Sequence, residues 1–179
     1  MKNMLTFARL IDALTERIGR AVIWLVLVAT LISAGNALSR YLLGASSNAW
    51  LEIQWYLFGA MFLLAAGYTL KHNGHVRIDI FYNRLGPRGQ AWIDLIGGLL
   101  FLLPMAGLLM WLAWPMFYEA WITQEHSPDA GGLLRWPVKL LLPAGFGLLA
   151  LQGVAEVIKR IGVLSGHLEL PREAPEEEV

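Results

Sequence analysis

The chain has 179 residues, of which 56% are hydrophobic and only 16% charged, and its net charge is zero. A soluble domain usually carries about 25% charged residues, so the composition indicates a membrane protein, and a neutral chain lacks the basic surface that nucleic-acid binding requires. The absence of cysteine excludes a disulfide framework, a thiol nucleophile and a thiolate-held metal.

The N-terminal segment has the pattern of an amphipathic helix. Residues 4–18 carry apolar side chains at helical spacing, and the charged side chains lie off that stripe. This pattern predicts a helix that lies at the cytoplasmic membrane interface before the first span. The alternative is a simple cytoplasmic extension of the first span.

Long apolar stretches follow, and they predict membrane spans over about residues 21–43, 50–70, 91–114 and 137–158. Each has about 20 residues or more, enough at about 1.5 Å per residue to cross a hydrocarbon layer of about 30 Å. Every backbone N–H and C=O in that layer must be paired within its own segment, so each stretch is predicted to be helical.

The expected fold is an all-α integral membrane protein with four transmembrane helices behind the amphipathic interfacial helix. Residues 1–164 form this single domain, and residues 165–179 are expected to be a disordered, acidic cytoplasmic tail. The first stretch is expected to remain as a span rather than to be a cleaved signal peptide. Its polar flank is long, and it stays apolar as far as Leu43.

The orientation follows from the basic residues, which favour the cytoplasmic side. With an even number of spans both termini share one side, together with the loop between the second and third spans. That side would hold eleven of the fourteen Lys and Arg: Lys2, Arg9, Arg17, Arg20, Lys71, Arg77, Arg84, Arg88, Lys159, Arg160 and Arg172. Both termini are therefore predicted to be cytoplasmic, and the connections 44–49 and 115–136 to be outside.

Two charged residues near the outer ends of the first two spans are candidates for an ion pair. Arg40 and Glu52 lie at similar predicted depth, and Asn36 lies one turn from Arg40 on the same helical face. The alternatives are that both charges extend to water or that they pair with another subunit. Ala29, Ser33 and Ala37 form a stripe of small residues on which another helix could pack closely.

The chain offers little that could carry chemistry. All four histidines fall outside the proposed spans, which disfavours a haem-anchoring subunit. His72 and His75 have a spacing compatible with metal binding, but no acidic or thiolate ligands cluster beside them. Buried acids are absent from the middle of the spans, where pumps and coupled carriers hold ionisable sites. We therefore expect an accessory membrane subunit that is not an enzyme and binds no cofactor of its own.

Three motifs in this order resemble the small membrane subunit, the Q or DctQ-like component, of tripartite ATP-independent periplasmic (TRAP) transporters. The motifs are Asn36-x-x-x-Arg40-Tyr41, Trp50-x-Glu52 and Gly74-His75-Val76-Arg77-Ile78-Asp79. Many relatives have two acids after the tryptophan, whereas Ile53 follows Glu52 here. The candidate subunit-interface or structural residues are Asn36, Arg40, Tyr41, Trp50, Glu52, His75, Arg77 and Asp79.

The resemblance implies a scaffold role in secondary-active transport at the bacterial inner membrane. In such systems a periplasmic binding protein delivers a small organic anion to a membrane pair. The large permease subunit of that pair holds the substrate and sodium sites, and the small subunit braces it. The expected partners are thus the large permease, the binding protein and membrane lipid, with no nucleic acid. The alternatives are a stand-alone four-helix channel or a membrane assembly factor, and, with less support, a membrane-embedded enzyme.

Overall fold

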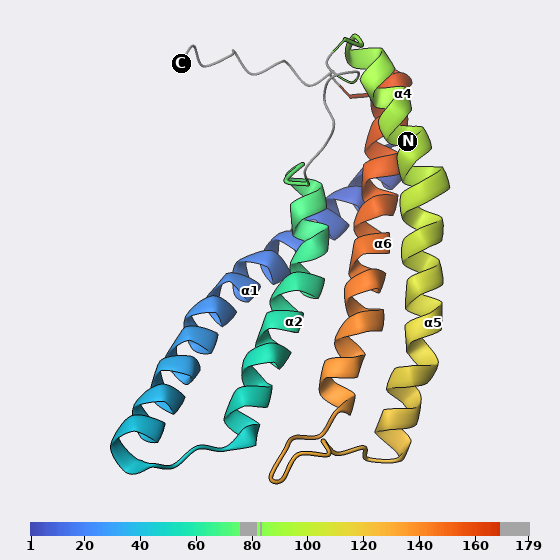
Figure 1. The fold of residues 1–179 in the computed structure, drawn as a ribbon. Coiled ribbons are helices and arrows are strands. Elements are labelled where there is room, and N and C mark those ends of the chain that lie inside the picture. The colour runs from blue at the N-terminus through green and yellow to red at the C-terminus, as the bar shows by residue number, and fades with distance from the viewer. Residues whose placement is uncertain (76–81, 83, 169–179) are drawn as a thin grey trace, which may run out of the picture.

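A computed structural model of the chain describes residues 1–75, 82 and 84–168. Its helices are α1 (Lys2–Leu43), α2 (Asn48–Lys71), α4 (Pro87–Gly97), a π-helical turn η1 (Gly98–Leu102), α5 (Leu103–Ile122) and α6 (Trp136–Leu164) (Figure 1). Within these described residues, four stretches of helix, 2–43, 48–71, 87–122 and 136–164, are long and apolar enough to cross a membrane. The all-α membrane fold expected from the sequence is confirmed.

The first helix is one uninterrupted element. Residues 2–43 are helical throughout, so the amphipathic segment 4–18 and the first predicted span are continuous. The sequence favoured a separate interfacial helix; the continuous helix instead matches the alternative of an extended first span. In Figure 1 α1 runs diagonally behind α2 and α6, and its buried residues, such as Ala8 and Ile11, all lie in its first 22 positions.

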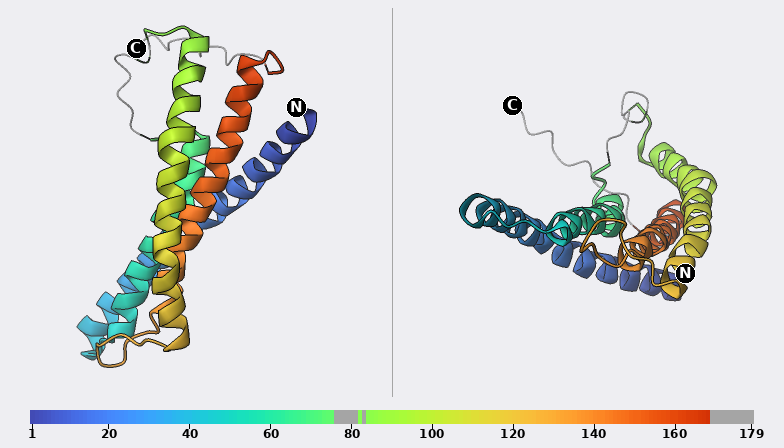
Figure 2. Two further views of the ribbon diagram at one scale, coloured as in Figure 1. Left: turned by 90° about the vertical axis from the view of Figure 1, so that its right-hand side faces the viewer. Right: turned by 60° about the horizontal axis from the view of Figure 1, so that its bottom comes forward.

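Helix α6 is the centre of the molecule. It packs against α1, α2, α4, η1 and α5, and α1 also packs along α2. In the most apolar window of α6, 39% of the residues are buried, against 6% to 11% in the other three stretches. Figure 2 shows that the helices form an open, curved row and not a closed bundle. Helix α5 lies at one edge, and α2 with the C-terminal half of α1 lies at the other.

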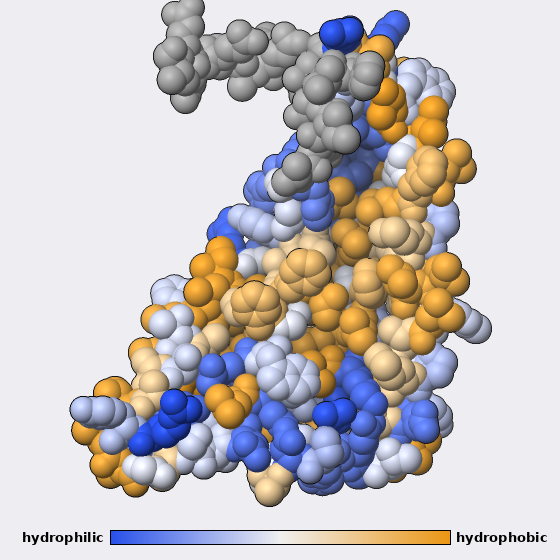
Figure 3. All heavy atoms as spheres, viewed as in Figure 1, coloured by the Kyte–Doolittle hydropathy of each residue, from blue (hydrophilic) through white to orange (hydrophobic). Residues whose placement is uncertain are grey.

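The helices approach one another through small residues. The buried positions are mostly alanine and glycine, and a Cβ added at Gly145 would lie 2.9 Å from the Leu63 carbonyl oxygen. Small residues allow such close contact between membrane helices. The large apolar side chains point outward instead, and they form a broad band across the face in Figure 3. This arrangement suits a protein whose surroundings are lipid or other apolar helices.

The third membrane stretch is longer than the sequence predicted. The span was expected to end near Pro115, but α5 continues through this proline to Ile122. The π-helical turn at Gly98–Leu102 ends two residues before Pro104, which has no N–H to donate and is expected to disturb the helix there. The connection to α6 is correspondingly shorter, 123–135. The predicted tail falls largely on residues 169–179, outside the described residues.

Candidate functional site

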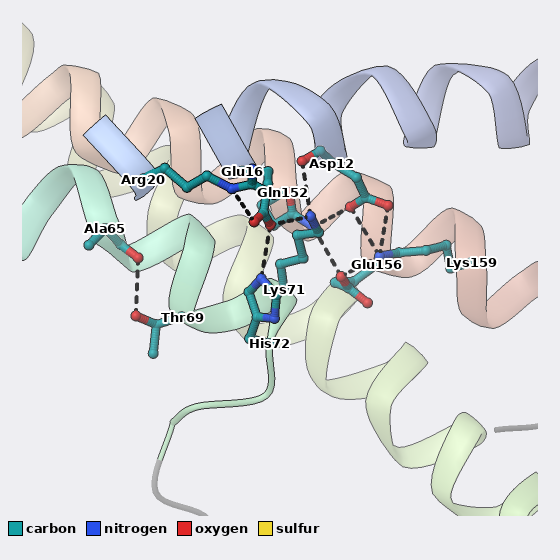
Figure 4. A network of polar contacts seen from close by, with 10 residues as sticks. All are labelled: Asp12, Glu16, Arg20, Ala65, Thr69, Lys71, His72, Gln152, Glu156 and Lys159. Carbon is teal, nitrogen blue, oxygen red and sulfur yellow. Dashed lines mark hydrogen bonds and ion pairs between the residues drawn. The ribbon is translucent and has the colours of Figure 1, made fainter. Parts of the chain in front are cut away.

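Polar side chains gather at the end of the molecule that holds the N-terminus and the C-terminal ends of α2 and α6. We call this the terminal end; the opposite hairpin end holds the connections 44–47 and 123–135. The group at the terminal end joins α1, α2 and α6 (Figure 4). This terminal cluster consists of Asp12, Glu16, Arg20, Lys71, His72, Gln152, Glu156 and Lys159.

One half of the terminal cluster connects α1 to α6. Gln152 is fully buried, and its amide nitrogen donates to Asp12 Oδ1 at 2.8 Å and to Glu156 Oε1 at 3.0 Å. The ammonium of Lys159 lies 3.1 Å from Asp12 Oδ1 and 2.6 Å from Glu156 Oε1. The two carboxylates therefore share one amide and one cation, and these contacts compensate for placing both acids between the helices.

The other half connects α1 to α2. The ammonium of Lys71 donates to Glu16 Oε2 at 2.6 Å and to the Asp12 carbonyl oxygen at 3.3 Å. Arg20 and His72 approach the same Glu16 carboxylate, each at 3.0 Å. Glu16 is thus held by three basic side chains, and the first half of α1 is fixed to both neighbouring helices.

A further ion pair joins the third and fourth membrane stretches at this end. Arg160 of α6 lies 3.0 Å from Asp94 of α4, and both side chains are more than four-fifths buried. The Tyr82 hydroxyl donates to the same carboxylate at 2.9 Å. Within residues 1–75, 82 and 84–168, no group of three or more His, Cys, Asp or Glu side chains could hold a metal ion.

At the hairpin end, Glu52 fixes the connection between α5 and α6. Its side chain is buried, accepts a hydrogen bond from the Ser127 hydroxyl and accepts the Leu133 backbone N–H at 2.6 Å. Gly132 is needed for this approach, because a Cβ there would lie 2.5 Å from the Ser127 Cβ. Two more contacts hold the hairpin: the Tyr56 hydroxyl donates to the Leu134 carbonyl, and the Asn48 amide donates to the Ala130 carbonyl.

The predicted ion pair between Arg40 and Glu52 does not form. Both oxygens of Glu52 accept hydrogen bonds from the hairpin. The sequence does not show that the hairpin competes with Arg40 for this carboxylate. Arg40 is exposed on α1, and its side chain has no hydrogen bond or ion pair with any described residue. The two alternatives for Arg40, solvent exposure or contact with another subunit, remain.

The other candidate residues that the structure describes lie at different places on or near α1 and α2. Asn36 is half-buried beside the start of α2, while the side chains of Tyr41 and Trp50 are exposed. His75 lines a groove between α1 and α2 together with Val26 and Phe62. Arg77 and Asp79 lie outside the described residues. Among the candidates that the structure describes, Asn36, Arg40 and Tyr41 line one groove beside α2, and Asn36 also lies near Trp50.

The terminal cluster was not anticipated. The amphipathic pattern of residues 4–18 predicts only that Asp12 and Glu16 lie on the polar side of a helix. The available signal was their spacing: Asp12 and Glu16 lie four residues apart, as do Gln152 and Glu156, so each pair shares one helical face. Sequence alone could not show that these two faces meet.

Comparison with known proteins gives a match to a protein family. No curated protein and no solved structure matches the chain. A family model described as tripartite ATP-independent periplasmic transporters, DctQ component, matches residues 29–162, about three-quarters of the chain. This match includes the motifs at Asn36–Tyr41 and Trp50–Glu52, together with α2, α4, α5 and nearly all of α6. The chain therefore belongs to the DctQ component family of TRAP transporters.

Proposed function

We propose that this chain is the scaffold subunit of a secondary-active TRAP transporter that imports a small organic anion. Its partners would be a large permease subunit, which carries the substrate and sodium sites, and a periplasmic binding protein. The observation that carries the proposal is the family membership, together with the distribution of charge along the helices.

Each membrane stretch contains a long run without charged residues. The sequence has no Asp, Glu, Lys or Arg between Arg20 and Arg40, between Glu52 and Lys71, between Asp94 and Glu119, or between Lys139 and Glu156. A subunit that bound an anion or a sodium ion at mid-depth would be expected to place polar or ionisable groups there. These runs carry no charge and few polar side chains, Asn36 and Gln152 among them, and this scarcity supports a bracing role instead.

The proposal places the protein in the bacterial inner membrane with its terminal end in the cytoplasm. This orientation rests on the excess of basic residues at that end. Because the chain has no cysteine, single substitutions report cleanly on sidedness. In intact cells an impermeant maleimide should label Ala130→Cys in the hairpin, and Leu85→Cys should react only after the membrane is permeabilised. The reverse pattern would overturn the orientation.

The function is tested by omitting one component at a time from proteoliposomes. The permease encoded beside this chain, the accompanying binding protein and a panel of radiolabelled carboxylates would be combined under a sodium gradient. Uptake of one carboxylate should require all three proteins. Ion conduction by this chain alone would instead favour a channel, and full uptake without it would contradict a necessary scaffold role.

A second measurement tests where the coupling ion binds. Asn36→Ser and Gln152→Ala should lower the maximal uptake rate or the yield of the complex, while the sodium concentration at half-maximal uptake stays unchanged. A shift of several-fold in that concentration, with assembly intact, would place part of the ion site in this subunit.

A further inference from the structure

Two polar side chains near the hairpin end of α1, those of Asn36 and Arg40, have no hydrogen bond or ion pair with any residue in the described ranges. They lie one turn apart on α1, and the residues before and after them in the chain are mostly apolar. A polar group without a partner is expensive at membrane depth, so such residues usually face a protein partner or a water-filled cavity.

These side chains line a groove beside α2. The groove has a volume of about 600 Å³, and its wall on α1 consists of Ser33, Asn36, Ala37, Arg40 and Tyr41. Leu51 and Gln54 from the first turns of α2 form the opposite wall. The amide nitrogen of Gln54 is used within its own helix, where it donates to the Trp50 carbonyl at 2.9 Å.

No acid among the described residues forms an ion pair with Arg40, and two of the acids at the hairpin end are engaged elsewhere. Glu52 is held by the hairpin, and Glu125 is paired with Lys139 and lies 3.9 Å from Arg135. A cation on this face is therefore complementary to a carboxylate supplied from outside the chain. Arg is well suited to such a contact because its planar guanidinium binds a carboxylate through two parallel hydrogen bonds.

The depth and shape of the groove favour a protein helix over a lipid headgroup. At about 1.5 Å per residue along the helix axis, Ser33 lies about 10 Å from Arg40 and Asn36 about 6 Å from it, both on its N-terminal side. A phosphate held at the membrane surface by Arg40 would not reach both. Ala29, Ser33 and Ala37 share this face of α1, and their small side chains allow a second helix to approach closely.

We propose that this groove receives a transmembrane helix of the large permease subunit, with a carboxylate of that helix against Arg40 and a hydrogen-bonding side chain against Asn36. The inference rests on the proposed function, because it takes the permease to be the partner. It goes further by assigning the contact to one face of α1 and by stating the chemistry that the partner must present.

The test is site-specific photo-crosslinking in the assembled complex. Benzoylphenylalanine replaces Ala37, which lies in the groove, or Leu42, which is 70% exposed and lies about 180° round the helix from Ser33. The Ala37 probe should crosslink to the permease, and the Leu42 probe should do so at least about tenfold less. Equal crosslinking from both positions, or crosslinks from Ala37 only to lipid or to a second copy of this chain, would overturn the inference.

Substitutions then test the chemistry. Arg40→Ala should reduce recovery of the co-purified complex by about tenfold or more, Arg40→Lys should restore part of it, and Leu42→Ala should match wild type. The thermal stability of each purified subunit separates misfolding from lost contact. Unchanged recovery with Arg40→Ala would refute the carboxylate contact. If the wild-type chain failed to bind the permease at all, the proposed function itself would fail.

Discussion

The two ends of α1 differ in how their polar side chains are satisfied. At the terminal end, Asp12 and Glu16 are held by bases and a buried amide from α2 and α6. Near the hairpin end of the same helix, Asn36 and Arg40 have no such partner among the described residues. A helix anchored at one end and incomplete at the other is what a subunit requires if it folds by itself but functions in a complex.

Among the substitutions considered, the loss of Lys159 from the terminal cluster should lower the stability of the subunit most. Lys159→Met would leave Asp12 and Glu156 facing each other without their shared cation. The side chain of Lys159 is 28% exposed, so we expect a loss of about 2 kcal/mol in the free energy of unfolding, between the values for surface and fully buried pairs. Denaturation of the purified subunit in mixed micelles measures it. Arg9→Met, an exposed charge loss on α1, is the control, and an equal loss in both variants would contradict the role of the cluster.

A smaller effect is expected at the hairpin end. Glu52→Ala removes the acceptor for the Ser127 hydroxyl and the Leu133 N–H, which costs about 1–2 kcal/mol locally. The hairpin should open more often, so a cysteine in place of the half-buried Leu134 should react with maleimide about tenfold faster in the Glu52→Ala background. Glu52→Gln, which keeps one acceptor, should lie between. An unchanged labelling rate would show that Glu52 does not hold the hairpin.

The smallest effect concerns Arg40 and Glu52 together. Because they are not paired in the structure, the stability changes of Arg40→Ala and Glu52→Ala should add within about 0.5 kcal/mol in the purified subunit. A double-mutant cycle measures this coupling directly. A coupling energy clearly above that limit would restore the ion pair that the sequence suggested and would weaken the case for an external partner of Arg40.

The sequence predicted the helical membrane fold well because apolar length alone identifies a span. It predicted the ends less well, since α5 continues through Pro115 and α1 has no break after residue 18. It failed where contacts depend on which helical faces meet. Glu52 could be matched with Arg40 by depth and charge, but only the folded hairpin shows that Ser127 and Leu133 reach it first. The terminal cluster was missed for the same reason, because Gln152 and Asp12 are 140 residues apart.

The most direct test of the account compares the two ends of α1 in the purified subunit, without any partner. Asp12→Ala and Arg40→Ala each remove one charge from the same helix, and thermal unfolding in detergent reports the stability of each variant. The account predicts that Asp12→Ala lowers the melting temperature by several degrees, whereas Arg40→Ala leaves it within about one degree of wild type. An equal or larger loss with Arg40→Ala would show that this arginine is satisfied within its own chain and would contradict the account.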